Sequence, residues 1–335
     1  MNRLMVIGSL CLLPLWLQAG EPDGTLVADG NSANTYQTIT SAGYMYECPD
    51  ESRDHASHPF QHIQQTYDAD LGKDVFQFFI HALIDDDRGI ESTTDRQRNE
   101  IKTWDKSPAY MVGQEGDSLT IQWKFKLPLG MLTTNRFTHI HQLKGIDNQQ
   151  GTADVSMPLV TFTCCTSGSG PNAHQVLQVR HNNRTDGMMD KLAEVDLGQL
   201  LGRWISVIEN FRVGEKGYYS VTLTDMSTQK VIVSIVGHPC DMWRTDCAGI
   251  RPKWGIYRYI GENRSMENVL RDEELRYADF SIRKVKPTTG IRQTEMSQAT
   301  RPHYYNLLGC QTTPLLTRQN EVVYIYKGKK FLGNK

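Results

Sequence analysis

The chain has 335 residues, and its 36 Lys and Arg residues nearly balance its 38 Asp and Glu residues, for a formal net charge of −2. A charge this close to zero argues against a protein that binds nucleic acid through a strongly basic surface. Hydrophobic residues make up 39% of the chain, which at this length is enough for the core of one large domain.

The first 20 residues have the layout of a secretory leader. Arg3 precedes a short apolar run, and the small residues Ala19 and Gly20 follow it, as in a signal peptide. The run is short for a bilayer span, although an uncleaved membrane anchor is the alternative. We therefore expect residues 1–20 to be removed and the mature protein to be secreted or periplasmic, without a membrane segment.

The cysteines fit an exported protein. Of the seven cysteines, Cys11 lies in the leader, and an even number in an oxidising compartment suggests disulfides. Cys240 and Cys247 enclose a short loop and form the pair that we favour. Cys164 and Cys165 are adjacent, so on a strand they would point to opposite faces and bond different partners. A structural zinc site is the alternative, but no Cys-x-x-Cys spacing supports it.

Most of the chain after the leader is predicted to form strands. Residues 21–57 are rich in Gly, Ser, Asn, Asp and Thr, and we expect a loosely ordered lead-in there. From residue 58, short β-branched and aromatic runs alternate with turn signals, several at a period of two. The clearest runs are residues 75–80, 118–127, 159–163, 175–180, 218–224 and 230–235. Many short strands at even spacing predict an all-β sandwich or jelly roll with few short helices.

The end of the chain changes in character. Residues 188–201 are compatible with a short helix or a loop, and the sequence Pro-Thr-Thr-Gly at 287–290 is typical of a linker. We expect one catalytic domain at 58–286 and a C-terminal extension at 287–335, in which residues 322–326 have the composition of a strand.

The first of three motifs lies at residues 95–104. On a strand, Arg98, Glu100 and Lys102 share one face. Such a face can pair its own charges, or it can present positive charge to an acidic ligand; a solvated strand face is the alternative. Upstream, the acidic run Asp85–Asp87 is a candidate for a structural calcium ion, with a solvated turn as the alternative.

The second motif lies at residues 137–145. On a strand, His139 and His141 share a face, where they could transfer protons near neutral pH. With a third ligand they could instead bind a metal, and each alone could be a structural histidine. Because no acidic or histidine partner stands nearby in the sequence, we predict no metal here.

The third motif lies at residues 251–259. Arg251, Lys253, Gly255, Tyr257 and Tyr259 share a face of the expected strand. Gly255 leaves room for a ligand or for another backbone. Lys253 is expected to lower the pKa of Tyr257 by favouring the phenolate. An ordinary cross-strand pair of an aromatic and a cation is the alternative.

The three motifs resemble, in order, those of the jelly-roll polysaccharide lyases typified by the family 7 alginate lyases. These carry Arg-x-Glu-Leu-Arg, then Gln-Ile-His, then Tyr-Phe-Lys-Ala-Gly-Val-Tyr. This chain has Arg-Asn-Glu-Ile-Lys at 98–102, His-Ile-His at 139–141 and Lys-Trp-Gly-Ile-Tyr at 253–257. The Gly-Ile-Tyr-Arg sequence at 255–258 is similar to that of glucuronan lyases and heparin-lyase-I-like enzymes. The resemblance covers residues 58–286 and implies a concanavalin-like β-jelly-roll sandwich.

Three positions depart from the family pattern: His139 replaces Gln, Lys102 replaces the last Arg of the first motif, and Arg251 replaces the leading Tyr of the third. The departure at His139 favours a substrate other than plain alginate.

The resemblance also implies a reaction and its residues. β-Elimination removes the C5 proton of a uronate and expels the oxygen at C4, so it needs a base, an acid and donors that neutralise the carboxylate. By position, Arg98 and His139 would contact the carboxylate, His141 would be a base candidate and Tyr257 the acid, or both acid and base. Elimination would be syn if Tyr257 does both and anti if His141 is the base.

The remaining candidates bind or orient the substrate. Lys253 would bind it and tune Tyr257, and Glu100 would orient Arg98 more than react. The other candidate substrate-binding residues are Lys102, Arg251, Arg258 and Gln142. No metal or organic cofactor is needed by this scheme, so calcium would be structural only.

The sequence thus predicts a secreted, monomeric polysaccharide lyase that leaves 4,5-unsaturated uronate ends on an acidic polysaccharide. A glucuronate-containing glycan is favoured, with alginate as the alternative. A non-catalytic, lectin-like sandwich is the rival of another class. A laminarinase-like hydrolase would need paired carboxylates, and its usual Glu-x-Asp-x-x-Glu motif is absent from the sequence.

Overall fold

The computed structural model describes residues 23–51, 60–88, 90, 92–182 and 189–285, together with the backbone of four short strands nearer the C-terminus. The chain divides into two compact units, residues 1–286 and residues 287–335. The expected signal peptide at 1–20 lies outside the described residues. Within the described ranges, no helix combines the length and the hydropathy needed to cross a membrane.

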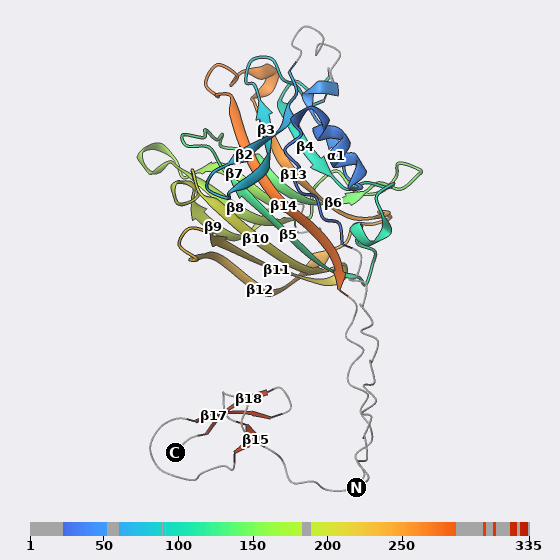
Figure 1. The fold of residues 1–335 in the computed structure, drawn as a ribbon, viewed down its shortest axis with the longest axis vertical. Coiled ribbons are helices and arrows are strands. Elements are labelled where there is room, and N and C mark those ends of the chain that lie inside the picture. The colour runs from blue at the N-terminus through green and yellow to red at the C-terminus, as the bar shows by residue number, and fades with distance from the viewer. Residues whose placement is uncertain are drawn as a thin grey trace, which may run out of the picture. The chain divides into compact units, whose positions relative to one another are not determined.

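The first unit is a sandwich of two antiparallel sheets (Figure 1). The first sheet has, in spatial order, β1 (Met45–Glu47), β4 (Arg96–Lys102), β13 (Gly249–Tyr259), β6 (Thr138–Ile146), β7 (Val160–Ser167), β8 (His174–Asn182) and β9 (Met189–Asp196). The second sheet has β12 (Val231–Met242), β11 (Gly214–Asp225), β10 (Trp204–Arg212), β5 (Ser118–Lys126), β14 (Glu273–Val285), β3 (Lys73–Ile80) and β2 (Ile63–Asp68).

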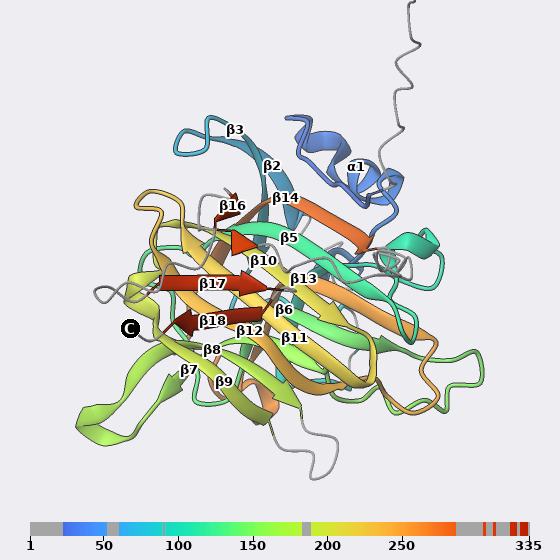
Figure 2. The same cartoon turned by 90° about the horizontal axis from the view of Figure 1, so that it is seen from below.

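Helices are short and lie at the edges and ends of the strands. The α-helix α1 (Thr35–Ser41) lies at the edge of the sandwich beside β2 (Figure 2). The other helical turns among the described residues are of the 3-10 type: η1 (Ser32–Asn34), η2 (Pro49–Glu51), η4 (Ala109–Met111), η5 (Gly170–Asn172), η6 (Leu197–Gln199) and η7 (Glu262–Arg264). The predicted all-β jelly-roll sandwich with few short helices is confirmed.

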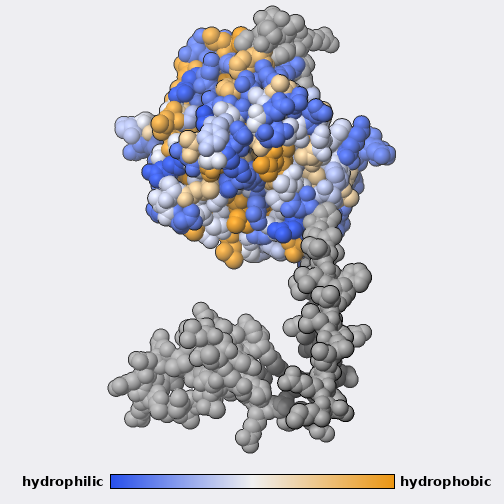
Figure 3. Space-filling view, in the orientation of Figure 1, coloured by the Kyte–Doolittle hydropathy of each residue, from blue (hydrophilic) through white to orange (hydrophobic). Residues whose placement is uncertain are grey.

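The second sheet follows the alternation that the sequence predicts. In β5, Leu119, Ile121, Trp123 and Phe125 are buried, and the residues between them are partly exposed. The face of the domain shown in Figure 3 is correspondingly mostly polar, with scattered apolar patches. A strand with one dry and one wet face is the ordinary element of an antiparallel sandwich.

Two expectations about local structure are wrong. Within 188–201 the chain forms strand β9 followed by the turn η6, because β9 pairs with β8 along its length. The described part of the 21–57 lead-in is also ordered. Leu26, Ile39 and Tyr44 of this segment are buried in the core, and burial of this kind outweighs a polar composition.

A polar centre around Glu209 lies between the sheets. The carboxylate of Glu209, fully buried on β10, accepts hydrogen bonds from Trp123 Nε1 at 2.8 Å and Tyr219 Oη at 2.7 Å. The ring of His141 on β6 faces the same carboxylate, with Nε2 3.1 Å from Oε1. Burial acts to raise the pKa of Glu209, but these three partners lower it. A buried carboxylate therefore ties the two sheets together.

The expected Cys240–Cys247 disulfide is absent. Cys164, Cys165, Cys240 and Cys247 are free thiols. Cys240 lies on β12 opposite Gly217, whereas Cys247 precedes β13 and its Cβ packs toward Gly145 of β6. Proximity in sequence therefore does not bring the two thiols together, since each is fixed by a different sheet.

The second unit contains four short strands, β15 (Tyr304–Tyr305), β16 (Gln311–Thr312), β17 (Val322–Tyr326) and β18 (Lys329–Gly333), in the order β16-β15-β17-β18. The strand expected at 322–326 is β17, which pairs with β18.

Replacement of Glu209 tests the inter-sheet centre. Glu209→Ala leaves Trp123, Tyr219 and His141 facing each other without an acceptor, and we expect it to lower the free energy of unfolding by about 3–5 kcal/mol. Glu209→Gln, which keeps one acceptor, should cost less. Denaturant unfolding measures both, with the exposed Glu115→Ala as the control. Equal stability of the Glu209→Ala and Glu115→Ala variants would contradict this account.

Candidate active site

The three sequence motifs lie on adjacent strands of the first sheet. β13 pairs with β4 on one side and with β6 on the other, so that Tyr257 stands opposite both Arg98 and His139. We call the side of this sheet that faces away from the second sheet its outer face. Arg98, His139 and Tyr257, which are far apart in sequence, come together there.

The outer face of the first sheet is unusual because it is buried yet charged. Every residue of β4 from Gln97 to Ile101 is buried, and so is almost all of β13. The outer-face members are polar: Arg98, Glu100, Gln142 and Lys253 all have less than a tenth of their surface exposed. Burial of a charge is costly unless the charge is paired. The charged residues of this layer must therefore pair with opposite charges within the layer.

Two carboxylates hold the layer together. Glu47 of β1 accepts hydrogen bonds from Lys253 at 2.7 Å and Arg88 at 2.5 Å, and from Lys102. Glu100 pairs with Lys253 at 2.6 Å and with Arg98 at 3.0 Å. Burial acts to raise the pKa of each carboxyl group, but the surrounding cations, Lys253 first, lower it. We therefore treat both as ionised at neutral pH.

Glu47 was not a sequence candidate. It lies in the segment that was expected to be loosely ordered, and the three-residue strand β1 places it directly opposite Glu100. A Glu in a strand this short gives no sequence signal, because the pairing partner that buries it lies on a distant part of the chain.

Arg98 is placed beneath Tyr257, and its donors are engaged. Its Nε donates to Asp87 Oδ1 at 2.6 Å and its Nη1 to Glu100 at 3.0 Å, while its Cζ lies 3.8 Å from the centre of the Tyr257 ring. The expectation that Glu100 orients Arg98 agrees with this contact. The expected contact between Arg98 and a substrate carboxylate does not agree, because reaching one would break these pairs. A cation–π contact of this kind positions the phenol instead.

The acidic run Asp85–Asp87 does not converge on one point. Asp87 binds Arg98, whereas Asp85 Oδ1 lies 3.0 Å from His62 Nε2. The two carboxylates are therefore committed to different partners.

Tyr257 is a protonated phenol at neutral pH. Burial raises its pKa, although Arg98 and Arg96 oppose the shift. Arg96 Nη1 donates a hydrogen bond to Tyr257 Oη at 2.7 Å, and Arg96 Nε donates one to Asp95 Oδ1 at 2.6 Å. The expectation that Lys253 favours the phenolate is wrong, because its ammonium group is held by Glu47 and Glu100. Arg96 was missed, although the alternation Arg96-x-Arg98 places both arginines on one face.

His139 and His141 do not share a face, which corrects the sequence prediction. His139 pairs with Thr163, but His141 pairs with Phe162, so Ile140 is an extra residue in β6. Such a bulge shifts the facing of every later residue by one. His141 therefore points into the core against Trp123 and cannot serve as a base for an external substrate.

His139 remains on the outer face. Its Nδ1 lies 2.8 Å from Thr163 Oγ1, and its ring centre lies 5.8 Å from that of Tyr257. Burial and the nearby Arg180 lower its pKa to about 3, so the imidazole is neutral at physiological pH. In the tautomer that donates from Nδ1 to Thr163, Nε2 carries the lone pair of a base.

A hollow opens beside His139. It has a volume of about 200 Å³ and is lined by Arg136, Phe137, His139, Met157, Pro158, Arg180 and Met189. Two arginines line it and no carboxylate does, so an anionic ligand is favoured. Arg180 of β8 is oriented by Gln178, which accepts from its Nε at 2.6 Å. Sequence reasoning missed Arg180 and Arg136, since neither belongs to a motif.

The remaining candidates have mixed positions. Lys102 and Gln142 lie in the charged layer, where they donate to Glu47 and Glu100 respectively. Arg251 donates to the backbone carbonyl of Thr103 at 3.4 Å. Arg258 faces the interior, where Gln97 accepts from its Nε at 2.9 Å. Its assignment to substrate binding is wrong because it alternates with Tyr257 along β13 and so points to the opposite face.

Gly255 makes room for a backbone and not for a ligand. A Cβ there would lie 2.1 Å from the carbonyl oxygen of Asn99 on β4, and the residue has φ +140°. Only glycine tolerates both conditions, so Gly255 allows β13 and β4 to approach closely.

Comparisons with known proteins give similar folds at low identity. Neither a protein-family model nor a curated protein sequence matches this chain. Among solved structures, an endo-β-1,4-glucuronan lyase from the fungus Trichoderma reesei is 12% identical, with a TM-score of 0.44 over 67% of this chain and 87% of that chain. The family 7 alginate lyase A1-II' is 14% identical, with a TM-score of 0.45 over 76% and 98%. A marine family 14 alginate lyase from Aplysia kurodai is 10% identical, with a TM-score of 0.48 over 78% and 98%.

Acidification tests the role of Glu47. Its folded-state pKa lies below its ordinary value of 4.5, so its contribution to stability is present above that value and is lost as the pH falls below it. We expect Glu47→Gln to destabilise the protein most at pH 7, with the difference from wild type shrinking below about pH 4.5. Denaturant unfolding across this range measures it, with Glu115→Gln as the control. A difference independent of pH would contradict the assignment.

Proposed function

We propose that this protein is a polysaccharide lyase that cleaves a uronate-containing acidic polysaccharide by β-elimination. One observation carries the proposal: a neutral imidazole, His139, lines a hollow that also holds two arginines, and it lies beside a protonated phenol, Tyr257. A base and an acid held together are what proton abstraction with leaving-group protonation needs. The three-motif resemblance described above supports the same reaction class.

The carboxylate of the substrate is assigned to the hollow. The C5 proton of a uronate is weakly acidic, and its removal requires that charge developing on the carboxylate be stabilised. Arg180 and Arg136 are the cations that line the hollow beside His139. Guanidinium groups bind carboxylates in a planar, two-point manner. These arginines therefore take the role that the sequence motifs assigned to Arg98.

The proton transfers are divided between two residues. His139 Nε2 accepts the C5 proton, the electrons of that bond form the C4–C5 double bond, and the C4–O4 bond breaks. Tyr257 gives its phenolic proton to the departing O4 oxygen. Arg96, which donates to Tyr257 Oη, stabilises the phenolate that this step leaves. The products are a 4,5-unsaturated uronate end and a new hydroxyl end, and no cofactor takes part.

A glucuronate-containing polymer is the proposed substrate, with alginate as the alternative. The preference rests on the Gly-Ile-Tyr-Arg sequence at 255–258. We also propose that the chain is exported after loss of residues 1–20 and acts as a monomer. A lectin-like protein would use the same arginines but would have no need of an acid poised beside a neutral imidazole.

Tyr257→Phe tests the acid. We expect turnover to fall by about 10²–10⁴-fold, because the proton donor is lost, while polymer binding in affinity electrophoresis persists. The increase in ultraviolet absorbance from unsaturated uronate measures turnover on glucuronan, alginate and heparin-type chains. Tyr259→Phe, two residues along on the same strand face, is the matched control. Wild-type protein that binds a polymer in this panel but cleaves none would establish the lectin-like alternative.

His139→Gln tests the base, because it restores the residue found at this position in the family 7 motif. Glutamine can contact a carboxylate but cannot accept a proton. If His139 is the base, kcat should fall by about 10²–10⁴-fold with little change in KM. Activity close to that of wild type would instead assign both proton transfers to Tyr257.

A further inference from the structure

A second cluster of reactive side chains lies apart from the arginine-lined hollow. His62, which precedes β2, His81, which follows β3, and Asp85 bring one ligand-type atom each to within 4.8 Å of one another. His62 Nε2 lies 3.2 Å from His81 Nδ1 and 3.0 Å from Asp85 Oδ1. His81 Nδ1 lies 3.2 Å from Asp85 Oδ2.

These separations match the edges of a coordination polyhedron. Metal–ligand bonds of about 2.0–2.1 Å place neighbouring ligand atoms about 3.0 Å apart in octahedral geometry and about 3.4 Å apart in tetrahedral geometry. The two imidazole nitrogens and the Asp85 carboxylate, which presents Oδ1 to His62 and Oδ2 to His81, are therefore spaced like ligands around a common point.

Asp50 prepares His62 to act as a ligand. Its carboxylate accepts a hydrogen bond from His62 Nδ1, which directs Nε2 toward His81 and Asp85. A carboxylate behind the second ring nitrogen is the usual way in which proteins orient a metal-binding histidine. With Nδ1 as the donor, a neutral His62 points its Nε2 lone pair at a carboxylate oxygen 3.0 Å away. That arrangement is repulsive unless a cation, either a metal ion or a proton, lies between them.

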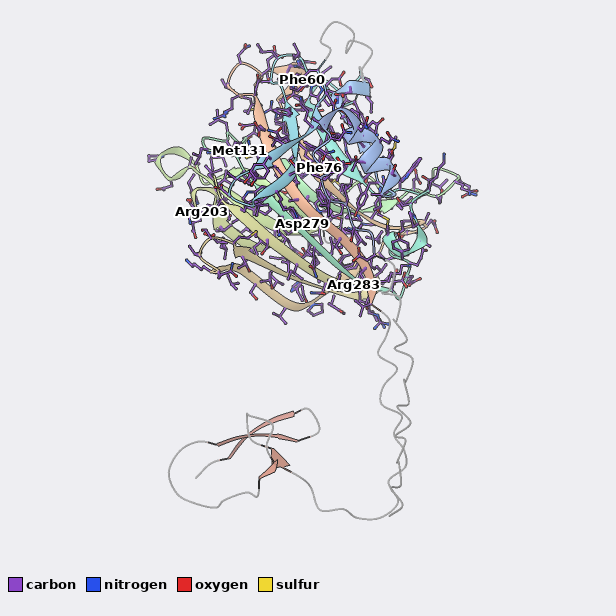
Figure 4. All side chains as sticks on the ribbon, viewed as in Figure 1. Phe60, Phe76, Met131, Arg203, Asp279 and Arg283 are labelled. Carbon is purple, nitrogen blue, oxygen red and sulfur yellow. The ribbon has the colours of Figure 1, made fainter. Side chains whose placement is uncertain are left out.

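The surroundings suit a bound ion with one open position. The ring of Phe60, near the end of β3 (Figure 4), packs edge-on against His62 at 5.2 Å and His81 at 4.7 Å. His62 and Asp85 are almost fully buried, whereas 18% of the His81 side chain is exposed. His81 also lines a cavity of about 470 Å³, which gives an ion access and leaves room for water as a further ligand.

We propose that His62, His81 and Asp85 form a binding site for a divalent transition-metal ion, for which Zn²⁺ is the best match. Two imidazoles and one carboxylate are a donor set that suits zinc, whereas calcium and magnesium prefer oxygen ligands throughout. The proposal does not depend on the proposed lyase activity.

The site would fix the segment that supports Tyr257. The Gln97 side chain donates to the backbone carbonyls of His81 at 2.8 Å and Asp85 at 2.8 Å. Asp87, two residues after Asp85, orients the Arg98 guanidinium beneath the phenol. An ion bound to His81 and Asp85 would therefore restrain the segment from which Asp87 contacts Arg98, and Arg98 in turn contacts the ring of Tyr257.

The experiment measures the metal directly on untagged, full-length protein. After treatment with a chelator and dialysis, Zn²⁺ is titrated by calorimetry and the retained metal is counted by mass spectrometry. We expect one zinc ion per chain, an increase in Tm on zinc addition, and the visible absorption of a low-symmetry site when Co²⁺ replaces zinc. Asp50→Asn should weaken zinc affinity by about 10–100-fold, and His81→Ala by at least as much.

His174→Ala is the matched control, because His174 is exposed and contacts only a nearby carbonyl, that of Asn172, among the hydrogen bonds described. Its zinc affinity should equal that of wild type. Circular dichroism checks the fold of each variant. If His81→Ala does not fold, the zinc affinity of Asp50→Asn is compared with that of wild type in its place. Failure of wild type to retain zinc, or equal affinity in wild type and the folded variant, would overturn the proposal and show that a proton alone holds the three groups together.

Discussion

The outer face of the first sheet depends on one constraint: the buried carboxylates of Glu47 and Glu100 must be paired with nearby cations. Both carboxylates are buried outside the apolar core, and Lys253 binds both of them. If either carboxylate were missing, the layer would hold uncompensated cations at low exposure, which is strongly unfavourable. The same pairing fixes Arg98, and Arg98 in turn fixes the ring of Tyr257. The charged layer is thus a rigid support, and the groups proposed to contact a substrate lie at its margin.

This division explains why the motif residues are more buried than their proposed roles would suggest. Arg98, Glu100 and Lys253 carry the sequence resemblance, yet their hydrogen bonds are directed at one another. Their geometry serves to hold a phenol in place, which is a requirement of precise proton transfer. The groups open to a ligand, Arg136 and Arg180, come from segments outside the motifs.

The sequence predicted the fold well and the site only in part. Period-two runs such as 118–127 identify strands because one face of each is dry, and this pattern is local. The bulge at Ile140 is not local: it depends on how β6 pairs with β7, and one extra residue moves His141 from the outer face to the core. Glu47 and Arg180 were missed for a related reason, since their roles come from neighbours distant in sequence. Arg96 was the exception, as its parity with Arg98 was readable.

The bulge also bears on how two proton transfers can be kept apart. With His141 facing Glu209 inside the sandwich, His139 is the histidine of the second motif that remains on the outer face, and burial, assisted by Arg180, keeps its imidazole neutral. Arg98 and Arg96 oppose, but do not overcome, the effect of burial on Tyr257, which keeps its proton. Burial therefore lowers the pKa of the base and raises that of the acid, because it disfavours imidazolium as well as phenolate. In the proposed mechanism His139 takes the C5 proton and Tyr257 protonates O4. Tyr257 therefore does not have to lose its proton before the C5 proton leaves.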